Sequence, residues 1–211
     1  MANWIDISMP LCPGCRLWPG DRPFEHAFSS RMADGSDYNT SIFACSAHVG
    51  THVDAPYHVQ ADGDTVDRLD PSIFMGEALV VEIQTPGHVS AGQLEQAIPR
   101  WPQRLLLKTR NSSPGGALDQ GGFDTTYCAL EVDAARLIAR RGLKLLGIDY
   151  NSVEPYSAGV EVHKTLLGAG IVTLEGLDLR GVRPGAYQLV AVPLRLKDFD
   201  ASPVRALLSQ A

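Results

Sequence analysis

The order of apolar and polar residues predicts strands in the first half of this chain and alternating helices and strands in the second. Strand-like patterns occupy residues 4–8, 41–47, 78–83, 104–109, 145–149, 171–175 and 187–196. Helical spacing of apolar residues occupies 91–98, 132–141 and 160–167. These helical segments are followed by Pro99, Gly142 and Gly168, which are typical residues at helix ends.

The remaining segments are predicted to be loops. Residues 9–40 are rich in Pro, Gly, Asp and Ser, and we expect long loops with brief strands there. The run at 41–47 is apolar enough for a buried strand, and 187–196 gives the strongest strand signal. The tail at 204–208 fits either a last strand or a short helix.

This order of elements predicts one mixed α/β or α+β domain over residues 1–211. A chain of 211 residues with 45% hydrophobic content suits one compact domain. Charged residues are 20% of the chain, which disfavours a disordered protein. No internal repeat or break in composition marks a second domain.

The net charge and the N-terminal residues bear on which partners and which cellular location we expect. A net charge of −6 and a pI near 5.4 argue against a nucleic-acid-binding surface. No apolar run reaches the length of a membrane span. The first residues lack a basic start followed by a long apolar stretch, so we expect no signal peptide and a cytoplasmic location.

Cys12 and Cys15 form a C-x-x-C pair, which could be a redox pair or half of a zinc site. The proline and glycine around them indicate a turn, whereas a thioredoxin-like pair opens a helix. A four-cysteine zinc site needs a second such pair, and the sequence has none. We therefore interpret Cys12 and Cys15 as reduced thiols in a loop. A redox protein remains the alternative.

Residues 48–58 hold the densest group of chemically active side chains. His48, His52, Asp54 and His58 are all separated by even numbers of residues. In an extended chain such residues share one face, whereas a helix would place Asp54 and His58 away from the first two. An extended or looped backbone can therefore gather all four. Two imidazoles and a carboxylate suit Zn²⁺, with Mn²⁺ or Fe²⁺ as alternatives, and Asp54 could bridge two metals.

A second group of ligands could come from the later half of the chain. His163 lies in a predicted helix that is followed by a strand ending on Glu175. Carboxylates at strand ends often face the crevice where α/β proteins bind ligands. From the residues alone, Glu175 has four rivals, which are Asp149, Glu154, Glu161 and Asp178. The two other histidines, His26 and His88, lie in polar loops and are not expected to bind metal.

Residues 48–58, His-Val-Gly-Thr-His-Val-Asp-Ala-Pro-Tyr-His, resemble the H-x-G-T-H-x-D-A-P-x-H signature of the cyclase family of metal-dependent hydrolases. This family includes bacterial kynurenine formamidase and isatin hydrolase. The match is complete at every fixed position. Shorter likenesses to the family occur at residues 18–21, 147–149, 152–155, 163–167, 174–177, 193–196 and 202–205.

The resemblance implies two divalent metal ions per chain, most readily Zn²⁺ with Mn²⁺ as the alternative. His48, His52 and Asp54 would hold one ion. Asp54, His163 and Glu175 would hold the other, so the resemblance selects Glu175 among its rivals. The implied fold is a single domain of the swivelling β/β/α type, with a mixed sheet and few helices, usually assembled as a homodimer or higher homo-oligomer.

The resemblance also implies the chemistry. His58 would act as the general acid/base, and Trp18 would help to form the substrate pocket. A metal-activated water would hydrolyse an amide, by this resemblance N-formyl-L-kynurenine, to give L-kynurenine and formate. The alternatives are a cyclic amide such as isatin, a lactone or another amide, or a non-catalytic metal-binding protein. No nucleic acid or membrane partner is expected.

Two departures from the kynurenine formamidase pattern bear on the substrate. Those enzymes commonly have a second histidine after the one at 163, where this chain has Lys164. The loop at 150–157 reads Tyr-Asn-Ser-Val-Glu-Pro-Tyr-Ser in place of the commoner T/A-P-S-V-D-P. Neither departure affects the implied metal ligands.

Overall fold

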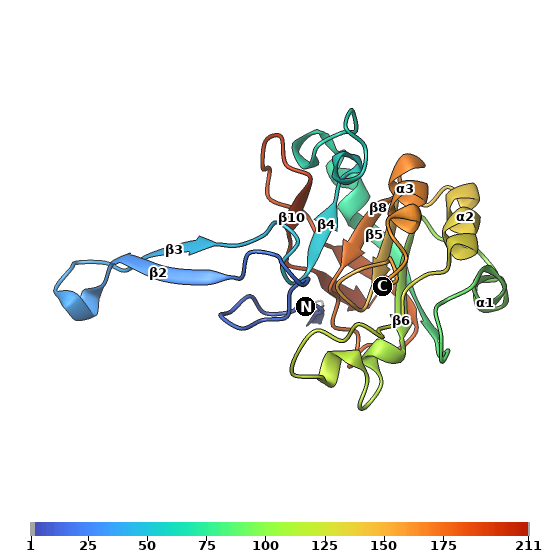
Figure 1. Cartoon of the computed structure of the whole chain (residues 1–211), viewed down its shortest axis with the longest axis horizontal. Coiled ribbons are helices and arrows are strands. Elements are labelled where there is room, and N and C mark those ends of the chain that lie inside the picture. Colours follow the sequence, from blue (N-terminus) through green and yellow to red (C-terminus); the bar gives the residue numbers. More distant parts are fainter. Residues whose placement is uncertain (1–2, 211) are drawn as a thin grey trace.

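A large mixed sheet forms the centre of the molecule (Figure 1). The computed structural model describes residues 3–210, and within them nine strands form this sheet in the order β1-β11-β9-β5-β6-β7-β8-β4-β10. Its strands are β1 (Trp4–Asp6), β4 (His52–Asp54), β5 (Met75–Ile83), β6 (Arg104–Thr109), β7 (Leu145–Ile148), β8 (Val172–Glu175), β9 (Gly185–Val190), β10 (Ala201–Pro203) and β11 (Leu207–Gln210).

Strands β5, β6, β7 and β8 run parallel, and the outer strands on both sides pair antiparallel. Three α-helices connect the parallel strands in the described part of the chain: α1 (Ala91–Ala97), α2 (Val132–Arg141) and α3 (Glu161–Gly168). All three lie on the same side of the sheet (Figure 1). Helix α1 begins with a capping box between Ser90 and Gln93, and α2 ends at Gly142 with φ of 68°.

Both faces of the central strands are buried, which explains their continuous apolar runs. In β6, Leu105 and Leu107 pack under the helices with Leu94 and Ile138. Leu106 points the other way and packs with residues from β4, β5, β8 and β9. The chain therefore has two apolar layers, one on each side of the sheet.

We expect Leu106→Ala to lower the free energy of unfolding by about 2–5 kcal/mol, because Leu106 is fully buried and its loss leaves a cavity. Urea denaturation followed by circular dichroism measures this change. The matched control is Leu194→Ala, since Leu194 is 56% exposed and its loss should cost less than about 0.5 kcal/mol. Equal effects of the two substitutions would contradict this assignment of the core.

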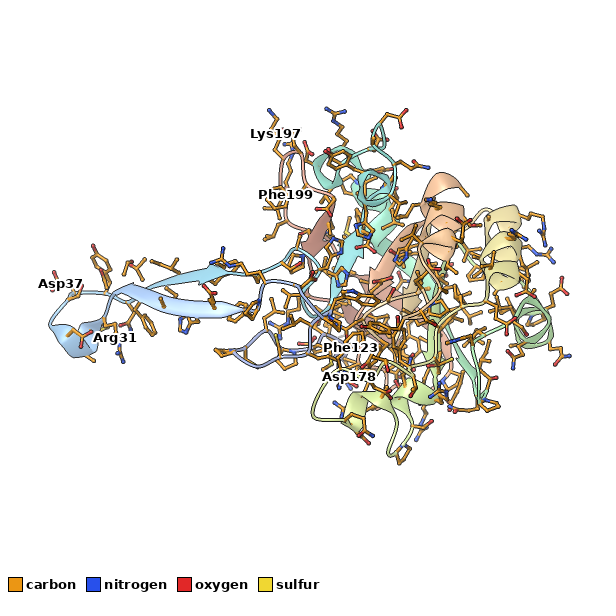
Figure 2. All side chains as sticks on the ribbon, viewed as in Figure 1. Arg31, Asp37, Phe123, Asp178, Lys197 and Phe199 are labelled. Atoms are coloured by element: carbon orange, nitrogen blue, oxygen red, sulfur yellow. The ribbon has the colours of Figure 1, made fainter. Side chains whose placement is uncertain are left out.

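A long hairpin projects from the body of the molecule (Figure 1). It consists of β2 (Glu25–Ser30) and β3 (Thr40–Ala44), and we call it the arm. Arg31 and Asp37 lie near its tip, far from the sheet (Figure 2). The strand predicted at 41–47 is present as β3, which ends at Ala44, but the prediction that it is buried is wrong. The run is apolar, but Ile42 and Phe43 are more than half exposed on the arm.

Most other predicted elements are present, with changed bounds. The predicted strand at 187–196 ends at Val190, and Pro193 follows soon after; proline has no backbone N–H to donate to a sheet. The tail predicted at 204–208 begins between β10 and β11 and enters β11 at Leu207, so its helical alternative is wrong. The prediction of a mixed α+β fold with few helices is confirmed. In the described residues no helix is both long and apolar enough to cross a membrane.

Candidate active site

Strand β4 provides the floor of the site. His52 and Asp54 are two residues apart on this strand, so their side chains share a face of the sheet. The neighbouring strand β8 places Glu175 directly opposite His52 and Thr173 opposite Asp54. The Thr173 hydroxyl donates a hydrogen bond of 2.8 Å to Oδ2 of Asp54. Strand register therefore fixes three predicted ligands relative to one another.

His48 and His58 flank this strand but are not part of it. His48 lies in a turn before β4, and His58 closes a 3-10 turn, Pro56–His58, after it. Of the extended or looped backbone predicted for residues 48–58, the strand covers residues 52–54 and turns form the rest. The turns still bring the four side chains together, since the rings of His48 and His58 have centroids 4.4 Å apart. Nδ1 of His48 lies 2.9 Å from Oδ1 of Asp54.

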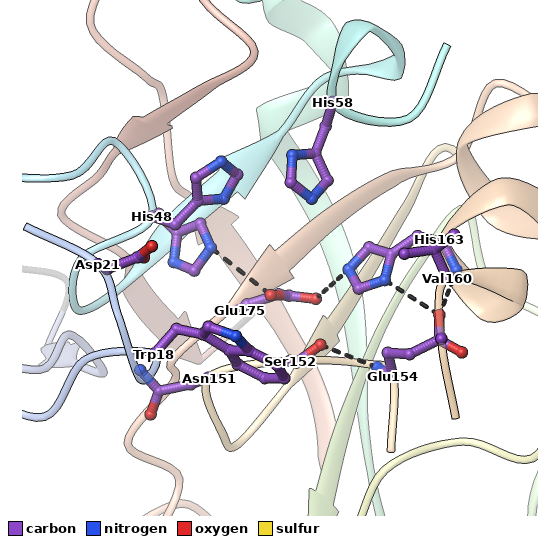
Figure 3. A pocket seen from close by; sticks show the side chains of 12 residues that line it. Trp18, Asp21, His48, His58, Asn151, Ser152, Glu154, Val160, His163 and Glu175 are labelled. Carbon is purple, nitrogen blue, oxygen red and sulfur yellow. Dashed lines mark hydrogen bonds and ion pairs between the residues drawn. The ribbon is translucent and has the colours of Figure 1, made fainter. Parts of the chain in front are cut away.

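Helix α3 brings His163 to the same place. Its Nε2 lies 3.1 Å from Oε1 of Glu175 and 3.7 Å from Oδ2 of Asp54. On the other side of the ring, Nδ1 lies 3.2 Å from Oε2 of Glu154. Glu154 also accepts hydrogen bonds from the backbone N–H groups of Val162 and His163 at the start of α3. Figure 3 shows Glu175 between the histidine side chains.

Each of the three predicted histidine ligands has one ring nitrogen held by an oxygen outside the cluster. Nδ1 of His52 donates to the carbonyl of Gly50 at 3.0 Å, and Nδ1 of His163 faces Glu154. Nε2 of His48 lies 2.9 Å from Oδ2 of Asp200. The other nitrogen of each ring therefore faces Asp54 or Glu175, as in metal sites where an outer partner fixes the tautomer of a ligating histidine.

Two unpartnered atoms support a cation at this point. Nε2 of His52 and Oδ1 of Asp54 are buried and make no hydrogen bond within residues 3–210; their nearest polar neighbours are other members of the same cluster, such as Nδ1 of His48 at 2.9 Å from Oδ1. Such buried polar atoms cost free energy unless something binds them. Potential ligand atoms of His48, His52 and Asp54 lie within 4.8 Å of one another, as do those of Asp54, His58 and His163. Nitrogen and carboxylate ligands in this number fit a divalent metal.

The electrostatics of the cluster also favour positive charge. Burial disfavours the charged ring of His48, but Asp54 and Asp200 raise its pKa to about 11. Burial acts in the same sense on His163, and Glu154 and Glu175 raise its pKa to about 10. The carboxylates therefore create a field that retains protons or attracts a cation.

A cavity of about 240 Å³ opens above these residues (Figure 3). Trp18 forms one aromatic wall, with its ring centroid 5.3 Å from those of Phe123 and Tyr156. The cavity is lined by Trp18, Asp21, His48, His52, His58, Asn151, Ser152, Glu154, Gly159, Val160, His163 and Glu175. The structure thus brings together all seven residues predicted from the sequence, with Asp54 buried beneath.

Of the rivals to Glu175, only Glu154 lies at the site, where it contacts His163 from the outer side. Asp149 accepts hydrogen bonds from Thr109 and Asn111. Asp178 pairs with Arg180, and Glu161 pairs with Lys164 at the surface. Lys164 is half exposed and does not line the cavity, so this departure does not alter the cavity wall.

Asp200 contacts two predicted site residues, and the sequence did not predict it, as it did not predict the cavity residues Asp21, Asn151 and Ser152. It lies 142 residues after His58 in the chain, yet its Oδ2 contacts both His48 and His58. Its only signal was its place two residues before 202–205, one of the segments that resemble the cyclase family. By contrast, Cys12 and Cys15 form the predicted turn, with a backbone hydrogen bond between them and no disulfide.

Comparison with known proteins tests the family directly. The Cyclase family model matches residues 5–155. This chain belongs to the Cyclase family. It is 36% identical to the kynurenine formamidase of Bacillus cereus over 98% of this chain and 97% of that protein. The kynurenine formamidase of Geobacillus thermodenitrificans is also 36% identical, over 99% of this chain and 98% of that protein.

Solved structures of Cyclase-like proteins share the fold. A potential metal-dependent hydrolase with cyclase activity matches with a TM-score of 0.86 and 26% identity, covering 100% of this chain and 99% of that one. Isatin hydrolase A from Ralstonia solanacearum matches with a TM-score of 0.82 and 23% identity, covering 99% and 92%. The predicted family and the prediction of a metal-dependent hydrolase that acts on a carbon–nitrogen bond are confirmed.

Proposed function

We propose that this Cyclase-family chain hydrolyses N-formyl-L-kynurenine to L-kynurenine and formate, with residues 1–211 acting as one hydrolase domain. The observation that carries the hydrolase chemistry is the pair of unpartnered buried ligand atoms on His52 and Asp54, next to a cavity with an aromatic wall. The substrate rests on the match to kynurenine formamidases along almost the whole chain.

In this proposal the chain holds two divalent ions. His48, His52 and Asp54 would hold one ion, and Asp54, His163 and Glu175 would hold the other, with Asp54 shared between the two sets. We favour Zn²⁺, with Mn²⁺ as the alternative, because both accept imidazole and carboxylate ligands. A bound divalent cation lowers the pKa of water from 15.7 to about 7 and stabilises negative charge that develops on the carbonyl oxygen.

The remaining steps belong to side chains around the cavity. Trp18 packs against the aromatic ring of the substrate and directs its formamide group toward the ligand cluster. Attack by water forms a bond from oxygen to the formyl carbon, and the bond from that carbon to the aniline nitrogen breaks. His58 lines the cavity; as the general acid/base it accepts the proton that the water loses and donates it to the leaving nitrogen. The products are formate and the free aromatic amine.

We also propose that the chain forms a homodimer or a higher homo-oligomer. The support is the arm, which carries several large apolar side chains in contact with solvent; they are Phe28, Met32, Tyr38, Ile42 and Phe43. A two-stranded hairpin alone has little stability in water, so burial against another subunit would stabilise it. The cytoplasmic location stays a prediction.

The experiment is hydrolysis of N-formyl-L-kynurenine by the purified chain before and after removal of metal with a chelator. We expect turnover to fall to background on removal and to return with Zn²⁺ or Mn²⁺, because the cation supplies several kcal/mol of catalysis. Metal analysis should give about two ions per chain. Isatin, a lactone and other formamides are assayed in parallel.

Two outcomes would revise the proposal. Turnover that survives complete metal removal would contradict the metal-dependent mechanism. Bound metal with turnover of isatin or a lactone, but not of N-formyl-L-kynurenine, would assign another substrate to the same site. The loop at 150–157, which supplies Asn151, Ser152 and Glu154 to the cavity, would then be the place to look for the cause.

A further inference from the structure

Backbone hydrogen bonds hold Asp200 beside β4, the strand that carries His52 and Asp54. Asp200 directly precedes β10, in which Ala201 pairs with Asp54 of β4. Its backbone carbonyl accepts a hydrogen bond of 2.8 Å from the N–H of Ala55. The preceding loop, which carries Lys197 and Phe199 (Figure 2), is tied down by a hydrogen bond from Val66 to the carbonyl of Phe199. The position of the Asp200 backbone therefore follows from the sheet.

A single oxygen of Asp200 meets two imidazole rings. Its Oδ2 lies 2.9 Å from Nε2 of His48 and 3.4 Å from Nδ1 of His58. An ionised carboxylate only accepts hydrogen bonds, so both of these ring nitrogens carry a proton. In His48, Nδ1 is then the nitrogen that faces Asp54. In His58, Nε2 is the nitrogen that remains for proton exchange in the cavity.

We propose that Asp200 is a positioning residue that orients His48 as a metal ligand and His58 as the general acid at the same time. The part concerning His58 rests on the proposed function, whereas the part concerning His48 requires only that the cluster binds metal. Asp200 touches neither the substrate cavity nor the other ligands, because it is absent from the cavity lining and contacts the site through these two rings. It thereby couples metal affinity to proton transfer.

Asp200→Asn tests the link to His48. The change keeps the shape of the side chain but removes its charge and one of its two acceptor oxygens. Loss of such an outer partner weakens metal binding or activity by roughly 10- to 100-fold. We expect this loss in the dissociation constant for Zn²⁺, measured by competition with a coloured chelator on the purified chain. Asp198→Asn, the same change two residues earlier at an exposed site, should leave affinity within twofold.

Kinetics at saturating Zn²⁺ test the link to His58. For Asp200→Asn we expect kcat to fall roughly 10- to 100-fold with little change in KM. We also expect non-additivity, because a residue that acts through His58 has little left to lose once His58 is gone. The double variant Asp200→Asn with His58→Ala should therefore be little slower than His58→Ala alone.

These measurements separate the possible failures. Zn²⁺ affinity and kcat both within twofold of the parent would overturn the role of Asp200. A raised KM at unchanged kcat would also overturn it, because it would assign Asp200 to substrate binding. If the parent chain fails to hydrolyse N-formyl-L-kynurenine, the proposed function fails, while Zn²⁺ affinity still decides the link to His48. Thermal unfolding of each variant confirms that the fold is intact.

Discussion

Asp54→Asn is expected to abolish turnover, with a loss of roughly 10³-fold or more. The metal accounts for several kcal/mol of catalysis, and each 1.36 kcal/mol is a factor of ten in rate. Asp54 is fully buried and lies within 3.7 Å of ring nitrogens of His48, His52 and His163, so it would be shared by the two proposed sets of ligands. An amide in its place offers one oxygen and cannot bridge the two proposed ions.

Metal content and turnover should fall together in this variant. The first is measured by elemental analysis of the purified chain, and the second by the release of kynurenine. Asp62→Asn is the matched control, because Asp62 is exposed in the loop that follows residues 48–58. A variant that keeps both ions and loses activity would contradict the bridging role. A variant that keeps both its metal content and its turnover would show that Asp54 is not part of the site.

His58→Ala is expected to keep its metal and to lose activity by about 10²- to 10⁴-fold, the range typical of a lost general acid or base. The side chain of His58 is 29% exposed at the cavity, whereas those of His52 and His163 are nearly covered. Its ring is therefore placed to meet both the substrate and solvent. The loss should appear in kcat at saturating metal.

Metal analysis decides between two roles for His58. Its ring also lies in a group with Asp54 and His163 whose potential ligand atoms are within 4.8 Å of one another. If His58→Ala loses one ion, His58 is a ligand and the proton donor lies elsewhere. The control is His26→Ala on the arm, where the histidine is exposed and contacts only the ring of Phe28 among aromatic neighbours.

Local pattern was enough to predict the elements around the core. Residues 104–109 and 132–141 were predicted with the bounds that the structure has, because apolar periodicity records burial directly. Pattern failed at the arm, where apolar residues such as Ile42 and Phe43 are exposed. The pattern of apolar residues indicates which residues favour burial. It does not show whether they are buried within the same chain.

In the site, too, local sequence pattern predicted some residues and not others. His48, His52, Asp54 and His58 are neighbours in sequence, so their spacing alone indicated a metal site. Choosing Glu175 from its rivals needed the family resemblance. The apolar pattern of a strand does not show which other strands lie beside it in the sheet. The structure supplies the physical reason, since β8 lies beside β4 and Glu175 faces His52. Asp200 was not predicted because it is far from residues 48–58 in the sequence. It reaches them only because β10 pairs with β4, and the sequence pattern does not reveal this pairing.

The position of β4 between β8 and β10 also has a consequence for biosynthesis. Asp54 and its hydrogen-bond donor Thr173 are 119 residues apart in the chain, and Asp200 comes later still. A growing polypeptide therefore carries residues 48–58 through the synthesis of more than 100 further residues before the strands that enclose them are present. Pairing over such separations is slow, because a long loop must close first. Under the proposed function, the metal site can therefore be completed only after β8 and β10 have been synthesised and have paired beside β4.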